Sequence, residues 1–155
     1  MILTLPTSYF LVAGYAEGPT LLNAFDNALM KAGVGNTNLI KMSSILPPSC
    51  KHIEPVQLPY GALIPVAYAE ESSPQPGTPV AAAVACGVPD DRRLPGVIME
   101  HHMTDDEKTC REIVLQKLEA GFAARGYKLA VVQMASAFGV VKEVGSAFAG
   151  VVLWT

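Results

Sequence analysis

The sequence predicts an α+β fold in which two mainly antiparallel sheets pack face to face and each sheet is covered by one helix. Two segments show the apolar spacing of helices, and seven others are rich in strand-forming residues. A chain of 155 residues can build one substantial core, and no linker or internal repeat divides it. We therefore expect a single domain over residues 1–155, with the two sheets at its centre and the helices outside.

Both predicted helices have recognisable ends. The first follows Gly18-Pro19-Thr20 and ends at Gly33, and its apolar face comprises Leu21, Leu22, Phe25, Ala28, Leu29 and Ala32. The second opens with Thr104-Asp105-Asp106-Glu107, which is a capping-box pattern, and ends at Gly126. Its inward face comprises Cys110, Val114, Leu118 and Phe122.

The strands are predicted from β-branched and aromatic runs between turn residues. They cover Tyr9–Ala13, Thr37–Ser43, Ala62–Tyr68, Val80–Val88, Val97–His102, Leu129–Ala135 and Ser146–Trp154. The segment from Glu70 to Pro79 carries Ser, Pro and Gly and is predicted to be a surface loop.

Composition narrows the class of protein. Half of the residues are hydrophobic and 16% are charged, which favours an oligomer with covered interfaces. A net charge of -3 without a Lys/Arg run argues against nucleic-acid binding. Three cysteines without C-x-x-C spacing indicate a reducing compartment. With no signal peptide and no apolar run long enough for a membrane helix, we expect a cytoplasmic protein that does not bind membranes.

The segment with the most chemical content is Ser43-Ser44, at the end of a predicted strand that Pro47 and Pro48 prevent from continuing. A backbone forced out of a sheet is a plausible place for strain. The Ser44 hydroxyl can attack the Ser43 carbonyl to form an ester. Proton abstraction at the Ser44 alpha carbon would expel the ester and leave dehydroalanine, whose imine form takes up water and loses ammonia to give a pyruvoyl group at residue 44. Most Ser-Ser pairs, however, are ordinary turn or capping residues.

The surrounding sequence resembles the pyruvoyl-dependent arginine decarboxylases from Leu11 to Trp154. The matching blocks, in order, are Leu11-Val12-Ala13-Gly14, Leu22-Asn23-Ala24-Phe25-Asp26, Gly35 to Pro48, Gly61-Ala62-Leu63, Gly96-Val97-Ile98-Met99-Glu100, Ser146-Ala147-Phe148-Ala149 and Leu153-Trp154. Several separated blocks in the same order are far more specific than any single one.

The resemblance implies an αββα sandwich and a covalent pyruvoyl cofactor that the chain generates from Ser44. Cleavage between Ser43 and Ser44 would give subunits 1–43 and 44–155. The implied reaction converts L-arginine to agmatine and CO2, and the implied assembly is a trimer or a dimer of trimers with active sites between subunits. Glu100 takes the place of the family's proton donor, and its neighbours Val97-Ile98-Met99 would favour the protonated carboxyl.

Three further residues are predicted to serve the site, and each has a plainer alternative. Asp26 would bind the substrate guanidinium through two charge-assisted hydrogen bonds, although it also reads as an exposed helix residue. Asn38 would donate to the oxyanion during cleavage, although six extended residues, roughly 20 Å, separate it from Ser44. That contact requires a sharp bend or another subunit, and otherwise Asn38 closes a turn. Gly35 would allow close approach to the substrate or matter for backbone conformation alone.

The remaining polar residues near Glu100 are interpreted more modestly. His101 and His102 point to opposite faces of a strand, so they cannot chelate one ion, and we expect no metal site. His101 departs from the aromatic residue that the family more often has there, and we expect its imidazole beside Glu100 to affect the pH optimum. Lys41 is interpreted as a surface or interface cation.

Three other functions stay open from the sequence. The chain could decarboxylate a different amino acid, or it could be an uncleaved paralogue that assembles without catalysis. Cleavage before Ser44 could also expose the amine of an N-terminal-nucleophile hydrolase, although nothing in the chain resembles one.

Overall fold

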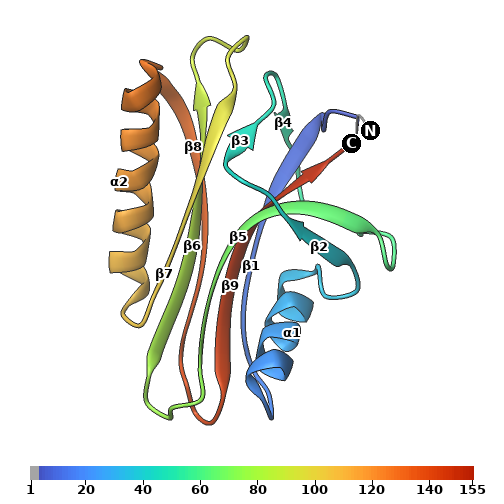
Figure 1. The fold of residues 1–155 in the computed structure, drawn as a ribbon, viewed down its shortest axis with the longest axis vertical. Helices are drawn as coiled ribbons and strands as arrows, with labels where there is room; N and C mark the ends of the chain where they lie inside the picture. Colours follow the sequence, from blue (N-terminus) through green and yellow to red (C-terminus); the bar gives the residue numbers. More distant parts are fainter. Residues whose placement is uncertain (1–3) are drawn as a thin grey trace.

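The computed structural model describes residues 4–155 and confirms the two-sheet, two-helix architecture (Figure 1). The five-stranded sheet has the order β2-β5-β9-β1-β4, and the four-stranded sheet has the order β3-β7-β6-β8. The strands of the first sheet are β1 (Ser8–Glu17), β2 (Asn38–Lys41), β4 (Lys51–His52), β5 (Leu63–Ser73) and β9 (Gly145–Trp154). Those of the second are β3 (Ile45–Leu46), β6 (Pro79–Pro89), β7 (Gly96–Met103) and β8 (Leu129–Val140).

Strand pairing is mainly antiparallel, as predicted. In the first sheet, β9 pairs antiparallel with both β1 and β5, while the short β4 and β2 add parallel pairs at the two edges. In the second sheet all pairs are antiparallel, with β6 between β7 and β8. The long central strands therefore form a rigid frame, and the short strands β2 and β3 lie at sheet edges.

The hydrophobic core has three layers. Between the sheets, Tyr9, Leu46, Val84 and Ile98 are almost fully buried. Helix α1 (Leu21–Ala32) packs on the outer face of the five-stranded sheet over Phe10, Ile64 and Phe148. Helix α2 (Glu107–Arg125) packs on the outer face of the four-stranded sheet, with Val114 and Leu118 buried against Val97. Neither of these helices is long and apolar enough to cross a membrane.

The ends of α1 are as predicted, but the start of α2 is not. Thr20 caps α1 by accepting from Asn23 N, and Gly33 ends the helix in the left-handed conformation. The N-cap of α2 is Asp106, whose side chain accepts from Thr109 N, so the capping box predicted at Thr104 is wrong. The cap is the second of two consecutive aspartates, so the helix begins at Glu107.

Several predicted boundaries also differ from the structure. On α1, Leu21 and Leu22 are exposed rather than inward, and Ala24 is buried. Strand β5 continues through Glu70 to Ser73, where a loop was predicted, because its polar end pairs with the β9 residues Gly145–Phe148. Strand β2 ends at Lys41 instead of Ser43, and β3 and β4, of two residues each, were not predicted.

The early end of β2 has an important consequence for the chain path. Strand β2 belongs to the five-stranded sheet and β3 to the four-stranded sheet, so residues 42–44 cross from one sheet to the other (Figure 1). The Ser43–Ser44 peptide lies in this crossing, at the edge of the sandwich.

Candidate active site

The Ser43–Ser44 peptide is fixed to a different sheet on each side. Before it, Met42 N donates to Val66 O of β5 at 3.1 Å. After it, Ser44 O accepts from Ile98 N of β7 at 2.7 Å. Ser43 is exposed and Ser44 is half-buried. The two hydrogen bonds hold the peptide between strands β5 and β7. A peptide bond that cuts itself would require such a fixed geometry.

Backbone strain in this segment lies downstream of the predicted position. Of the non-glycine residues in 4–155, Ser49 alone has a positive φ, at 61°. It follows Pro47 and Pro48 in a tight turn closed by Cys50 N donating to Pro47 O. Neither Ser43 nor Ser44 is in the left-handed conformation. The costly backbone conformation in this segment is that of Ser49, which follows the two prolines.

Glu100 is half-buried and follows the apolar residues Val97-Ile98-Met99 on β7. It lies on β7 two residues after Ile98, so both side chains point towards the space between the sheets. Its Oε2 atom is buried and has no hydrogen-bond partner among residues 4–155. Burial raises the pKa of this carboxyl, while the charges of Lys41, Lys117 and His102 act in the opposite direction. A buried oxygen without a donor is stabilised by keeping a proton, which is the state that a general acid requires.

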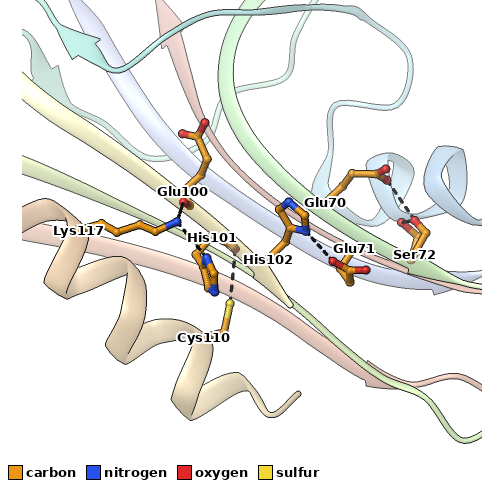
Figure 2. Close-up of polar contacts among 9 residues, drawn as sticks. Glu70, Glu71, Ser72, Glu100, His101, His102, Cys110 and Lys117 are labelled. Carbon is orange, nitrogen blue, oxygen red and sulfur yellow. Dashed lines mark hydrogen bonds and ion pairs between the residues drawn. The ribbon is translucent and has the colours of Figure 1, made fainter. Parts of the chain in front are cut away.

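The two histidines after Glu100 lie on opposite faces of β7, as strand alternation requires (Figure 2). His102 is on the Glu100 side and its Nδ1 pairs with Glu71 of β5 across the sandwich. His101 is on the α2 side, where its Nδ1 lies 3.0 Å from Lys117 Nζ. The expectation that the His101 ring sits beside the Glu100 carboxyl is therefore wrong. Among the histidines, it is His102 that lowers the pKa of Glu100 by its charge.

A single chain does not bring Asp26 or Asn38 to Ser44. Asp26 is exposed on α1, on the outer side of the five-stranded sheet, whereas Ser44 lies at the edge between the sheets. Asn38 stands at the far end of β2, and its amide donates to Gly61 O at 2.9 Å. Because β2 is extended, the length of the strand separates this amide from Ser44, as the sequence geometry indicated.

Gly35 has a structural reason that does not involve a ligand. A Cβ atom at this position would come within 2.8 Å of Met30 N and 2.5 Å of Met30 Sδ on α1. The chain therefore needs glycine to turn back closely against the helix before β2 begins. Its place in substrate binding stays a prediction.

A groove of about 480 Å³ lies beside the first turn of α1. Leu21, Leu22 and Phe25 form its apolar side, and Glu70, Glu71, Ser72 and His102 form its polar side. Neither Ser44 nor Glu100 lines it. The polar side of this groove was not identified from the sequence, because a loop was predicted over Glu70–Ser73. The adjacent carboxylates and serines in this segment are the signal that could have identified it. Within residues 4–155, no group of three His, Cys, Asp or Glu side chains is arranged to hold a metal ion.

Comparison with known proteins identifies the family of this chain. The family model "Pyruvoyl-dependent arginine decarboxylase" matches residues 8–153. The chain is 41% identical over 150 residues to the pyruvoyl-dependent arginine decarboxylase of Methanocaldococcus jannaschii, covering 97% of this chain and 91% of the relative. It is 39% identical over 151 residues to that of Thermococcus kodakarensis, covering 97% and 96% of the two chains.

A family model that covers residues 8–153 and relatives at 41% and 39% identity over nearly the whole chain define the class of protein as a pyruvoyl-dependent decarboxylase. The chain belongs to the pyruvoyl-dependent arginine decarboxylase family.

The residues present fit the group that the family name implies. Ser44 could supply the serine from which such a group forms, and Ile98 N donates to its carbonyl oxygen. Glu100 is on the same strand as Ile98, and its buried Oε2 has no hydrogen-bond partner among residues 4–155, so this carboxyl would suit a proton donor to the group.

Proposed function

We propose that this protein cuts its chain between Ser43 and Ser44, converts Ser44 to a pyruvoyl group and decarboxylates L-arginine to agmatine and CO2. Full-length similarity to the named decarboxylases supports the reaction. The observation that carries the proposal is the position of the Ser43–Ser44 peptide at the crossing between the sheets. Ser44 O accepts from Ile98 N of β7, the strand that also carries Glu100, whose Oε2 is buried.

In cleavage, the Ser44 hydroxyl attacks the Ser43 carbonyl carbon. The bond between Ser43 C and Ser44 N breaks as the ester forms, and the nitrogen takes up the proton that the hydroxyl releases. The hydrogen bond from Ile98 N holds the Ser44 carbonyl while this happens. Asn38 supplies a donor to the developing oxyanion, and because β2 holds its own Asn38 away from Ser44, we assign this donor to a neighbouring subunit.

In decarboxylation, the pyruvoyl carbonyl supplies an acceptor for the electrons that the departing carboxylate leaves behind. Glu100 then delivers the proton from its carboxyl to the substrate carbon that has lost CO2. Burial raises the pKa of Glu100, which favours the protonated carboxyl that this step needs. The other ionisable side chain of β7 on this face is His102, and it pairs with Glu71.

Asp26 binds the guanidinium of arginine, which a carboxylate matches with two parallel hydrogen bonds. Because Asp26 and Ser44 lie apart within one chain, the complete site forms between subunits, and we propose a homotrimer or a dimer of trimers. Exposed Ile40 on β2 and Ile45 on β3 flank the crossing, and exposed Leu63 lies opposite Asn38; such an assembly would cover this apolar surface.

The first test is the mass of the purified chain under denaturing conditions, followed by CO2 release from labelled arginine. Two fragments split between Ser43 and Ser44, with the larger lighter by one ammonia than a peptide that begins with serine, support the proposal. A single chain of 16.4 kDa without CO2 release favours the uncleaved paralogue. A larger fragment that begins with unmodified serine indicates stalled processing or a nucleophile hydrolase.

The choice of substrate is tested with Asp26→Asn. A large loss with arginine but not with amino acids that lack a guanidinium supports the role of Asp26. An unchanged rate removes Asp26 from binding and favours a decarboxylase of another amino acid. Lys31→Met, also on α1, is the control for charge changes on this helix.

A further inference from the structure

Lys117 of helix α2 makes an unusual link to the main chain of Glu100. Its ammonium group lies 3.3 Å from Glu100 O and 3.0 Å from His101 Nδ1 (Figure 2). The Glu100 carboxyl points away from α2, to the other side of β7. One lysine thus contacts two consecutive residues of the strand without touching the carboxyl itself.

The strand pairing explains why the Glu100 carbonyl is available. Ile98 N points towards β3, because it donates to Ser44 O. Backbone groups two residues apart point the same way, so the Glu100 carbonyl also points towards β3. That strand comprises only Ile45 and Leu46, which pair with Val97 and Gly96, so it has ended before Glu100. Lys117 Nζ supplies the donor that the missing ladder partner would have supplied.

The contact with His101 depends on the protonation of that ring. An ammonium donates only, so His101 Nδ1 must accept and the ring must be the neutral Nε2–H form. Protonation of Nδ1 would remove the acceptor and place two cations side by side. Burial and the charge of Lys117 lower the pKa of His101, which keeps the ring neutral near neutral pH.

Few other charged groups face this link. From α2, besides Lys117, the Cys110 thiol donates to His101 O at 3.4 Å. From β6, the residues on the α2 side are Ala81, Ala83 and Ala85, which carry no charge. His102 of β7 lowers the pKa of His101 by its charge, and Glu71 of β5 raises it. On the far side of β7, Lys41 acts on the Glu100 carboxyl.

We propose that Lys117 is a positioning residue for Glu100: it holds the Glu100 main chain from helix α2, and it does so only while His101 is neutral. The inference rests on the proposed role of Glu100 as the proton donor. Acidification protonates His101, releases Lys117 and lets the end of β7 move, so turnover falls. Raising the pH deprotonates Glu100 and also lowers turnover, which gives a bell-shaped profile.

The kinetic test compares wild type with Lys117→Met, Lys117→Arg and Lys108→Met. Lys108 is on the same helix, and its ammonium lies 4.0 Å from Glu112. All four proteins are first checked by mass for complete cleavage at Ser44. We expect Lys117→Met to lower kcat for arginine by roughly tenfold to 100-fold at similar KM, as displacement of a catalytic group does. Its alkaline limb should move to higher pH, because one charge that lowers the pKa of Glu100 is gone. Lys117→Arg keeps a cation with N–H donors and should restore most of the rate.

The pH test uses His101→Asn and His101→Phe. Asparagine keeps an acceptor for Lys117 that does not titrate, so this variant should retain activity and lose the acid limb. Phenylalanine, which is close to the aromatic residue that the family more often has here, removes the titrating charge as well as the acceptor and should also lose the acid limb. An acid limb that is unchanged in His101→Asn overturns the dependence on His101.

A readout without turnover decides the link itself. The three histidines can be titrated by NMR with ring-labelled histidine, and His101→Asn assigns the His101 signal. Lys117→Met should raise the pKa of His101, and Lys108→Met should leave it unchanged. An unchanged His101 titration in Lys117→Met overturns the link, and a shifted titration with unchanged kcat overturns the positioning role. If wild type releases no CO2 from arginine, the proposed function falls, and the positioning role falls with it.

Discussion

Three aromatic rings join the helix that carries Asp26 to the strand that leads to Ser44. Phe148 of β9 is fully buried, and its ring centroid lies 6.1 Å from that of Phe25 and 5.4 Å from that of Tyr68. Lys41 Nζ lies 4.5 Å from the centre of the Tyr68 ring, on the other side of the same cluster. Replacing Phe148 should therefore loosen both α1 and β2.

The substitution Phe148→Leu removes the ring but keeps a large apolar side chain. Each lost ring pair is worth about 0.5–1.5 kcal/mol, so the two pairs together predict a loss of about 1–3 kcal/mol in the free energy of unfolding. For a domain of this size each kcal/mol lowers the melting temperature by about 2–4 °C, which predicts a fall of about 2–12 °C. Phe148→Ala would also open a cavity and cost about 3–5 kcal/mol.

The assay is thermal unfolding by circular dichroism at fixed protein concentration, followed by kinetics with arginine. Because Asp26 follows Phe25 on α1, the KM for arginine should rise more than kcat falls. Phe138→Leu is the matched control, since Phe138 is 38% exposed on β8 in the other sheet. A melting temperature for Phe148→Leu within about 1 °C of wild type, or an equal fall in Phe138→Leu, would refute the reasoning.

Three further results are expected. Glu100→Gln should cleave normally but lower kcat by about 10²–10⁴-fold. Because the pKa of Glu100 is raised in the folded state, the protonated carboxyl contributes stability at acid pH that is lost as the pH rises through the raised pKa. The melting temperature of Glu100→Gln relative to that of wild type should therefore increase with pH. Gly14→Ala puts a Cβ atom 2.7 Å from Ala28 O of α1 and should destabilise the fold by about 1–3 kcal/mol in urea unfolding, and an unchanged midpoint would contradict this packing. Asp106→Ala should lower the melting temperature at neutral pH, whereas Thr104→Ala should not. The hydrogen bond from Thr109 N lowers the pKa of Asp106, so the difference in melting temperature between Asp106→Ala and wild type should vanish as the pH falls through that lowered pKa. Equal effects at both positions would restore the capping box at Thr104.

The sequence predicted the layers of the fold because they depend on periodicity. Apolar spacing identified both helices, and alternation identified the long strands, of which β6 and β9 are almost continuously buried. The short strands β3 and β4 escaped prediction because two residues carry no period, and both lie next to the proline turn. The polar end of β5 escaped for another reason: Glu70–Ser73 have loop-like composition, and only the pairing with β9 makes them a strand.

The candidate site was predictable in its residue types but not in its geometry. The burial of Glu100 followed from its apolar neighbours, and the position of Asn38 far from Ser44 followed from the rise of a strand. Strand alternation also places the His101 side chain on the face of β7 opposite that of Glu100. The same alternation separates His101 from His102. Lys117 could not be found from the sequence, because its contact with Glu100 O depends on where β3 ends.

The strand order of the five-stranded sheet changes what folding means for this protein once it is cut at the proposed bond. Residues 1–43 carry β1, which lies between β4 and β9 and pairs with β9 over its whole length, and both of those neighbours belong to residues 44–155. The processed molecule is then an intertwined pair of chains whose stability obeys mass action, so its unfolding midpoint should depend on concentration even within one subunit. Because the proposed reaction starts from an intact Ser43–Ser44 peptide, maturation would be one-way: two separated pieces could reassociate, but they could not repeat the reaction that made the protein active.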